Sequence, residues 1–494
     1  MEVFSDMWAE SVTIPELQQL MTDGELTSVE LTWFFLQRIA RYDRQGPQLN
    51  SVIELNPDAL HIAEALDLER RTRGARGPLH GIPILLKDNI DTGDKMHTSA
   101  GTLALKDSYA PGDSWVARKL RAAGAVILGK TNLTELANFM TVGMPNGYSS
   151  RGGQVLNPYG PGKFDVGGSS SGSGAAVAAN LATAAIGTET SGSILSPASR
   201  NSIVGIKPTV GLVSRSGIIP IAHSQDTAGP MARSVTDAAV VLGALTGVDE
   251  ADPATRTSVG RAYSDYTQFL DPNGLQGLRI GVPREGYLDR LSADQLALVA
   301  QAIAALREAG ATVIDPVPLY YPKEKWVSPV LIYEFKVNLN AYLARLDPSV
   351  PVHSLRELIA FNFAHPKETL KYGQTLLLKS EATSGTLTEP EYIEARARDL
   401  RLSRDEGIDK TMREYRLDAL LFANNLGAGI AARAGYPSIT VPGGYDSQGL
   451  PLGITFTGRA YSEPTLIRIA YAFEQATRLR RPPELDRAEQ KVDN

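Results

Sequence analysis

The chain has 494 residues, 43% of them hydrophobic and 21% charged, which is the composition of a globular protein with a large core. The formal net charge of -6 is spread without long runs of one sign, so we expect neither a nucleic-acid partner nor attraction to an anionic membrane. With no cysteine and only six histidines, the sequence excludes disulfides, thiolate nucleophiles and cysteine-ligated metals, and we do not expect a histidine metal site. No apolar run reaches the ~18 residues of a membrane helix, and the first residues lack a signal-peptide core, so we expect a cytoplasmic protein.

The N-terminal part predicts two helices, then a strand and a third helix. The sequences TIPE (13–16) and TSVE (27–30) match the capping box, in which a hydroxyl and a glutamate three residues later satisfy free backbone donors at a helix start. The apolar stripe of the second helix indicates that it packs against the body of the protein. Residues 51–55 are typical of a short strand and residues 57–73 of a polar helix.

A lysine follows the next apolar run. Residues 82–86 are almost continuously apolar and are followed by Lys87 and Asp88, which is typical of a buried strand that delivers a lysine at its end. Burial can lower the pKa of a lysine by several units and leave a neutral amine that accepts a proton. An ion pair between Lys87 and Asp88, or another carboxylate, explains the pattern equally well, so the residue types leave both interpretations open.

Three further elements are predicted at 114–123 (helix), 125–128 (strand) and 130–139 (helix). Residues 124–131 also match the Walker A spacing G-x-x-x-x-G-K-[ST]. Their four central residues are Ala-Val-Ile-Leu, which favour a strand over a phosphate-binding loop, and a helix precedes them. We therefore do not expect a nucleotide site.

The passage from Gly167 to Ser193 is richer in hydroxyl groups and glycine than any other part of the chain. Two Ser/Gly-rich turns bracket the segment AAVAANLATAA, which is small, apolar and uncharged, so we expect a buried helix and strand here instead of a flexible linker. Residues 168–172 formally match the G-x-S-x-G nucleophile elbow of α/β hydrolases. That fold needs a strand before the elbow and a histidine near the C-terminus, and neither is present, because the last histidine is His365.

The rest of the chain predicts a long loop at 141–166, a helix at 234–245 and a strand-helix-strand unit from Leu278. Residues 326–415 are mostly helical and predict a lobe that covers one side of the sheet. Together these elements predict an α/β fold, with a large twisted mixed sheet covered by helices on both faces. We expect one domain over 1–494, made of N-terminal helices (1–50), a core with the functional motifs (51–250), a mostly helical lobe (251–415) and a return to the core sheet (416–494).

Three motifs carry a resemblance to a known family. GIPILLKDN with Lys87, GGSSSGS with Ser169 and GTETSGSILSPAS with Ser193 occur in this order and resemble the amidase signature family. The likeness runs from LTSVELTWFFLQRI to SEPTLIRIAYAFEQATR, which is essentially the whole chain. Within the family, the chain is most similar to bacterial peptide amidases, which release ammonia from C-terminal peptide amides. The resemblance implies the amidase signature fold.

The resemblance also implies a role for each motif residue. Ser193 is expected to be the nucleophile, Ser169 a bridging serine on a cis peptide bond, and Lys87 the base, with an acyl-enzyme intermediate and no metal, nucleotide or organic cofactor. The backbone N–H groups of Thr190, Ser191, Gly192 and Ser193 are expected to form the oxyanion hole.

Several neighbouring polar residues are expected to support the site without taking part in the chemistry. Ser170 and Ser171 are interpreted as structural and Ser173 as the start of a helix. His80 and His223 are interpreted as hydrogen-bonded core or loop residues, and Asp226 as a turn or supporting residue outside the catalytic set.

Two departures from the family pattern bear on the substrate. Ser191 stands where relatives often have Gly or Asp, and the stretch 423–430 is a short Ala/Gly/Asn connection where a longer loop is usual. If that loop walls the acyl pocket, the pocket is more open, and aryl amides, anilides and carbamates become credible substrates.

The expected partner is a small amide or carbamate, and the expected assembly is a monomer or a homodimer. The alternative functions are a carbamate (urethane) hydrolase and a glutamine-hydrolysing subunit of a tRNA amidotransferase; an inactive binding protein is disfavoured by the intact Lys87, Ser169 and Ser193.

Overall fold

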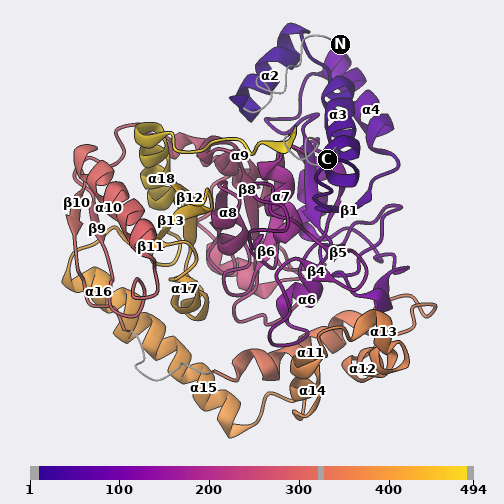
Figure 1. Cartoon of the computed structure of the whole chain (residues 1–494). Coiled ribbons are helices and arrows are strands. Elements are labelled where there is room, and N and C mark those ends of the chain that lie inside the picture. The colour runs from indigo at the N-terminus through magenta and orange to yellow at the C-terminus, as the bar shows by residue number, and fades with distance from the viewer. Residues whose placement is uncertain (1–10, 321–327, 487–494) are drawn as a thin grey trace, which may run out of the picture.

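The computed structural model describes residues 11–320 and 328–486. Within them, 11 strands form one mixed sheet in the order β1-β3-β2-β6-β8-β7-β12-β13-β11-β9-β10, which runs through the centre of the molecule (Figure 1). A separate small hairpin, β4–β5, lies in the long connection predicted at 141–166. The strands are β1 (Val52–Leu55), β2 (Pro83–Lys87), β3 (Val126–Thr131), β4 (Tyr148–Ser149), β5 (Gly153–Gln154), β6 (Ala184–Glu189), β7 (Val204–Lys207), β8 (Thr227–Ala232), β9 (Arg279–Gly281), β10 (Thr312–Ile314), β11 (Ala419–Ala423), β12 (Ser438–Tyr445) and β13 (Pro451–Thr457).

Three parallel neighbours, β3, β2 and β6, bring their last residues to the same end of the sheet. Lys87 pairs with Thr131 of β3, and Leu86, one residue earlier, pairs with Ile186 of β6. β6 ends at Glu189, beyond that point. All residues of β2 are buried, which confirms the predicted strand that delivers Lys87 at its end.

Helices flank the sheet in two groups, in agreement with the predicted α/β class. α7 (Ser171–Ala178) and α8 (Leu195–Arg200) contact each other, and they pack on β6 and on β7, β12 and β13 respectively. α9 (Val235–Leu245) and α18 (Glu463–Thr477) also contact each other and pack on β8 and β12. Every side chain of α7 is buried, so the segment between the two Ser/Gly turns is core and no linker.

Apart from the single turn α6 (Glu135–Asn138), the remaining described helices outside the lobe are α2 (Ile14–Asp23), α3 (Ser28–Arg38), α4 (Ala59–Arg73), α5 (Trp115–Ala122), α10 (Ala293–Glu308) and α17 (Ala428–Ala434). Short 3-10 or π-helical segments occupy Ile39–Arg44, Leu103–Leu105, Pro253–Ser258, Thr267–Phe269 and Arg401–Ile408.

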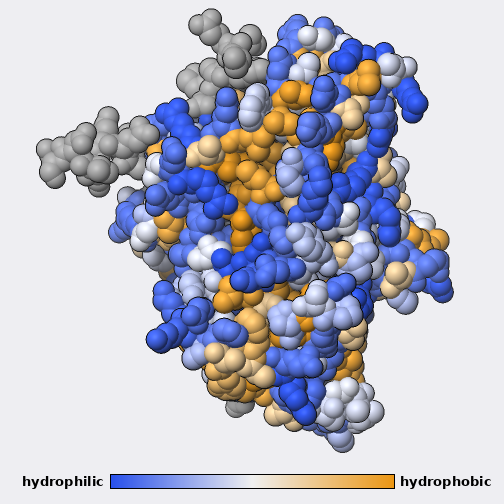
Figure 2. All heavy atoms as spheres, turned by 90° about the vertical axis from the view of Figure 1, so that its right-hand side faces the viewer, coloured by the Kyte–Doolittle hydropathy of each residue, from blue (hydrophilic) through white to orange (hydrophobic). Residues whose placement is uncertain are grey.

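The N-terminal helices begin where the capping boxes predict. At the start of α3, the Glu30 N–H donates to the Thr27 hydroxyl (3.1 Å), and the Thr27 N–H donates to the Glu30 carboxylate (2.9 Å). The buried Arg38 of α3 donates to the carbonyl oxygens of Ala179 and Asn180 after α7, which ties this helix to the core as expected. Figure 2 views the side of the molecule that carries α3 and α4 and shows an apolar area in its upper half, bordered by polar side chains.

The segment 130–139 does not form the predicted helix. Its first two residues complete β3, and the only helical piece is the single turn α6 (Glu135–Asn138), in which Leu136 and Ala137 have left-handed backbone angles (φ 49° and 54°). The Leu136 N–H donates to the carbonyl oxygen of Ala100 (2.9 Å). A tertiary hydrogen bond therefore takes the donor that a regular helix needs, and tertiary context overrides the helical propensity of the segment.

The helices of residues 330–414 form a lobe over one end of the sheet (Figure 1, orange). The lobe has an apolar cluster separate from the main core, which includes Phe335 and Leu339 of the lobe. The same cluster includes Leu133, in the loop after β3, and Ile219, in the loop before β8. These loops lie at the strand ends near Lys87, so the prediction that the lobe covers a side of the sheet is wrong: it closes the end. The first two residues of the predicted lobe, 326 and 327, lie outside the described residues. The lobe helices are α11 (Val330–Leu343), α12 (Leu355–Ala364), α13 (Pro366–Thr369), α14 (Thr375–Glu381), α15 (Pro390–Leu400) and α16 (Asp409–Glu414).

In the described part of the chain, no helix combines the length and apolar character needed to cross a membrane.

Candidate active site

Lys87 is fully buried at the end of β2 and meets the first serine turn. Its Nζ lies 2.8 Å from Oγ of Ser169 and donates to the carbonyl oxygen (3.2 Å) and Oγ1 (2.9 Å) of Thr188. The Asn89 side-chain amide donates to the same Thr188 hydroxyl (3.0 Å). Thr188 and Asn89 were not among the predicted site residues. Thr188 lies near the end of β6, the strand that pairs with β2, so the strand pairing explains its place beside Lys87.

The pKa of Lys87 suits a base. Burial lowers it to about 7, and the charges of Glu189 and Asp226 oppose this effect only in part. Within the described residues, Nζ has hydroxyl and carbonyl partners and forms no ion pair. Near neutral pH, a large fraction of this lysine is therefore an uncharged amine that can accept a proton.

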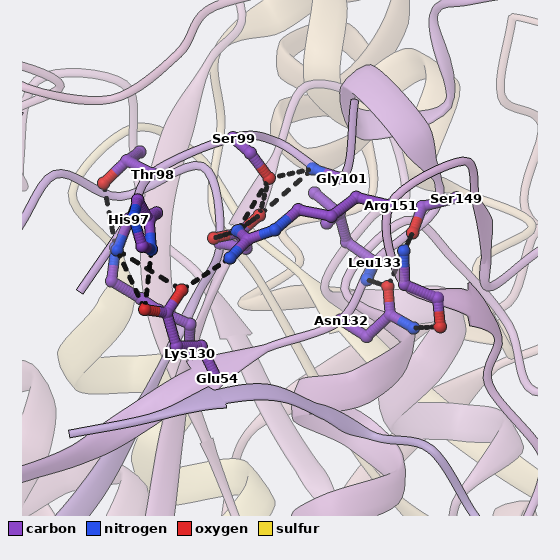
Figure 3. A network of polar contacts seen from close by, with 12 residues as sticks. Glu54, His97, Thr98, Ser99, Gly101, Lys130, Asn132, Leu133, Ser149 and Arg151 are labelled. Carbon is purple, nitrogen blue, oxygen red and sulfur yellow. Dashed lines mark hydrogen bonds and ion pairs between the residues drawn. The ribbon is translucent and has the colours of Figure 1, made fainter. Parts of the chain in front are cut away.

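Asp88 is engaged elsewhere and does not pair with Lys87. Its carboxylate accepts from the Gly101 N–H (3.1 Å), from the Ser99 hydroxyl and from the Arg151 guanidinium (3.4 Å). Arg151 also donates to Glu54 (2.6 Å), and Figure 3 shows it reaching between Glu54 and Ser99. Because Arg151 compensates the charge of Asp88, the ion-pair interpretation of Lys87 with Asp88 is wrong.

The first serine turn presents Ser169 to the lysine. The Gly168–Ser169 peptide bond is cis, as the family resemblance implied, and Ser169 is fully buried. The next two serines have structural partners: Ser170 donates through its hydroxyl to Thr188 O (3.1 Å), and Ser171 donates to Gly167 O (2.6 Å). The Ser170 N–H donates to the Ser193 carbonyl (3.1 Å) and joins the two turns directly.

The second turn is held by a buried glutamate that was not among the predicted site residues. The Glu189 carboxylate accepts the backbone N–H groups of Gly192 (2.7 Å), Ile194 (2.7 Å) and Leu195 (3.0 Å). It therefore fixes the chain on both sides of Ser193. A sequence signal existed, because Glu189 is the only charged residue between Gly167 and Ser193.

Of the four backbone N–H groups expected in the oxyanion hole, one already has a hydrogen-bond partner within the described residues. The N–H groups of Thr190, Ser191 and Ser193 form no backbone hydrogen bond within the described part of the chain, whereas the Gly192 N–H donates to Glu189. Gly192 was expected in the oxyanion hole, and its N–H has another partner. Its glycine identity has a different cause, since its φ is 86°, in the left-handed region that side chains rarely adopt.

Ser193 itself is 7% exposed, and its Oγ forms no hydrogen bond with a described residue. At the start of the same turn, the Thr190 hydroxyl donates to Asp226 (2.6 Å), which also accepts from the N–H groups of Ile221 and Ala222 (2.9 Å each). Burial raises the pKa of Asp226 to about 6. This carboxylate anchors the turn and a neighbouring loop, which is the supporting role expected for it.

The other sequence candidates lie outside the site chemistry. Lys130, from the Walker-like segment, is buried and donates to Ile90 O (2.7 Å) and Thr98 Oγ1 (2.9 Å). The strand predicted at 125–128 is confirmed, and β3 extends it to Thr131. The His80 ring is buried and bonds to Leu66 O (2.9 Å). In the described residues, no group of three or more His, Asp or Glu side chains is arranged to hold a metal ion.

The short connection noted at 423–430 lies against the turn that carries Ser193. β11 ends at Ala423 and α17 begins at Ala428. A side-chain carbon placed on Gly192 would lie 3.0 Å from Nδ2 of Asn425 and 3.5 Å from Cβ of Ala428. The connection therefore packs beside Gly192, the residue that precedes Ser193.

Comparisons with known proteins show the family of the chain. The family model described as "Amidase" matches residues 30–467. The chain is 43% identical to a probable amidase of Arabidopsis thaliana (96% of this chain and 92% of that protein) and 34% identical to a glutamyl-tRNA(Gln) amidotransferase subunit of Halorhodospira halophila (94% and 97%). It is 52% identical to the solved peptide amidase from Stenotrophomonas maltophilia, with a TM-score of 0.90 over 96% of this chain and 99% of that one. The chain therefore belongs to the amidase signature family and is an amidase.

Proposed function

We propose that this amidase cleaves carboxamides through an acyl-enzyme on Ser193, with Ser169 and Lys87 as its proton relay. One observation carries the proposal: a buried lysine, with its pKa lowered to about 7, lies 2.8 Å from the Ser169 hydroxyl. A serine hydroxyl is a weak nucleophile unless a base takes its proton. Among the described residues, no histidine ring forms a hydrogen bond with Ser169 or Ser193, and the His80 ring is bonded to Leu66 O.

The relay proceeds as a chain of two proton transfers. Neutral Lys87 accepts the Ser169 proton, Ser169 accepts the Ser193 proton, and Ser193 Oγ attacks the carbonyl carbon. The tetrahedral intermediate then breaks its C–N bond, and the proton returns through Ser169 to the departing nitrogen. Water repeats the cycle on the acyl-enzyme and releases the acid. Ser193 Oγ forms its hydrogen bond to Ser169 when substrate binds, since catalytic contacts often tighten at that point.

The negative charge of the tetrahedral intermediate is stabilised by the open N–H groups of Thr190, Ser191 and Ser193. Glu189 holds these groups in place by binding the backbone on both sides of Ser193. Such preorganised donors need no reorganisation as the charge develops, so their contribution to the rate is large.

We further propose that the preferred substrate is a C-terminal peptide amide. The 52% identity to the Stenotrophomonas maltophilia peptide amidase over nearly the full length of both chains supports this choice. The identity to the amidotransferase protein of Halorhodospira halophila is lower, at 34%, and favours a stand-alone enzyme over a glutamine-hydrolysing subunit.

A substrate panel on the purified chain tests the proposal. Peptide amides, aryl amides, anilides, carbamates and glutamine are compared by kcat/KM, with Ser193→Ala and Lys87→Ala as variants. We expect the peptide amide to rank first and both variants to lose at least ~10³-fold while remaining folded. A higher kcat/KM for carbamates would move the assignment to a urethane hydrolase, and exclusive turnover of glutamine would move it to the amidotransferase function. Near-normal activity of either variant would overturn the relay.

A further inference from the structure

Two consecutive asparagines follow β11 and have different environments. Asn424 is locked: its N–H donates to Gly453 O (2.7 Å), its Oδ1 accepts from the Gly453 N–H (3.0 Å), and its φ is 49°. This left-handed residue turns the chain toward the nucleophile. The backbone of Asn425 is fixed as well, because its carbonyl accepts from the Ala428 N–H (3.0 Å).

The Asn425 side chain, in contrast, has no partner. Neither its Oδ1 nor its Nδ2 forms a hydrogen bond with a residue of the described chain, and the side chain is half-buried. Nδ2 lies 3.0 Å from the position that a Cβ on Gly192 would take. A rigid backbone thus presents a free amide donor directly over the residue that precedes Ser193.

The residue beside this donor offers no backbone donor of its own. Gly192 is the residue of the turn whose N–H is taken by Glu189, so the hole has open backbone donors from Thr190, Ser191 and Ser193 and none from Gly192. A neutral amide suits the position, since it donates to a developing oxyanion without a charge that would need compensation when the site is empty.

We propose that Nδ2 of Asn425 completes the oxyanion hole by donating a hydrogen bond to the oxygen of the scissile carbonyl. The inference rests on the proposed function, because it assumes that Ser193 attacks that carbonyl. It gives the short connection after β11 a role in the chemistry in addition to shaping the pocket.

The test uses the asparagine pair. Asn425→Leu keeps the approximate volume and removes the donor, Asn425→Asp replaces the donor with a negative charge, and Asn424→Leu is the structural control. With one peptide amide as substrate, we expect Asn425→Leu to lower kcat by ~10²–10³-fold, the usual loss for one oxyanion donor, with KM changed less than about threefold. Asn425→Asp is expected to lose more, because its carboxylate repels the oxyanion. A peptide aldehyde, which forms a tetrahedral adduct with the serine, should bind Asn425→Leu weaker by a similar factor.

Thermal unfolding separates chemistry from packing. Both Asn425 variants should unfold near the wild-type temperature, whereas Asn424→Leu should unfold earlier. The inference is overturned if Asn425→Leu keeps kcat within about threefold of wild type, or if Asn425→Asp is as active as Asn425→Leu. If Asn425→Leu does not fold, the near-isosteric Asn425→Asp takes its place in the test, and a kcat of this variant within about threefold of wild type overturns the inference. An active Ser193→Ala enzyme would overturn the proposed function, whereas an inactive Ser193→Ala beside a normal Asn425→Leu would overturn only this inference.

Discussion

The proposed role of Lys87 as the base makes the reaction rate depend on pH through a single buried amine. Burial lowers its pKa to about 7, so the fraction of neutral lysine falls about tenfold for each pH unit below that value. We expect kcat/KM for a peptide amide to fall in the same proportion between pH 7 and pH 5 and to level off above about pH 8. A pH–rate profile of the wild-type enzyme checks this, and a rate that stays flat down to pH 5 would require another base.

The burial of Lys87 also lowers the free energy of unfolding at neutral pH, and a substitution of this lysine can recover that loss. Between pH 7 and 10.5 the unfolded chain keeps a proton on Lys87 that the folded chain has lost, so the folded state is disfavoured at neutral pH and regains stability as the pH rises toward 10.5. We expect Lys87→Met to be inactive but more stable at pH 7, by about 2 kcal/mol after the loss of its hydrogen bonds.

Lys130 is the matched control for Lys87. It is equally buried, but the charges of Asp88 and Asp91 act on it. Lys130→Met leaves these buried carboxylates without that compensation and should be less stable than wild type. Denaturant unfolding of both variants at pH 7 gives the comparison, and a destabilised Lys87→Met would contradict the burial argument.

At the scale of elements, the β6–α8 connection depends on Glu189. Its two carboxylate oxygens accept three backbone N–H groups, and an amide has only one accepting oxygen. We therefore expect Glu189→Gln to displace the Ser193 turn and to lower kcat by ~10–100-fold, with correct folding by circular dichroism. Unchanged kcat in this variant would show that the turn keeps its shape without the glutamate.

Local patterns in the sequence predicted most elements but not their tertiary partners. The apolar run before Lys87 and the capping box at Thr27 depend on nearby residues, and both predictions are confirmed. The segment 130–139 was predicted as a helix because its residue types favour one, but its backbone bonds to the distant Ala100. Within the site, the sequence motifs singled out Lys87 and Ser169, and the side chains of these two residues are in contact in the structure. Asn425 is separated from Ser193 by more than two hundred residues, so no local pattern could place it there.

At the scale of the whole molecule, the buried carboxylate of Asp91 helps to tie the lobe to the end of the sheet that carries Lys87. Asp91, four residues after Lys87, accepts from the Tyr342 hydroxyl of α11 (2.7 Å) and from the guanidinium of Arg345, which follows that helix (2.6 Å). Burial raises the pKa of Asp91 to about 6. It belongs to a group of buried carboxyls whose pKa values burial raises to about 6 or about 7, namely Asp91, Asp226, Asp237, Glu135 and Glu474.

These carboxyls predict that stability and activity change in opposite directions with pH. In the folded state they hold protons that the unfolded chain releases near pH 4, so their contribution to stability is present at low pH and is lost as the pH rises through 6 and 7. We expect the free energy of unfolding to fall between pH 5 and pH 7, while kcat/KM rises over the same interval as Lys87 loses its proton. Urea unfolding at pH 5, 6 and 7 measures the free energy of unfolding. In the Glu474→Gln variant this free energy should fall less between pH 5 and pH 7, because the pKa of Glu474 is raised to about 7. Stability that rises from pH 5 to pH 7 would mean that these carboxyls are ionised in the folded protein well below pH 6.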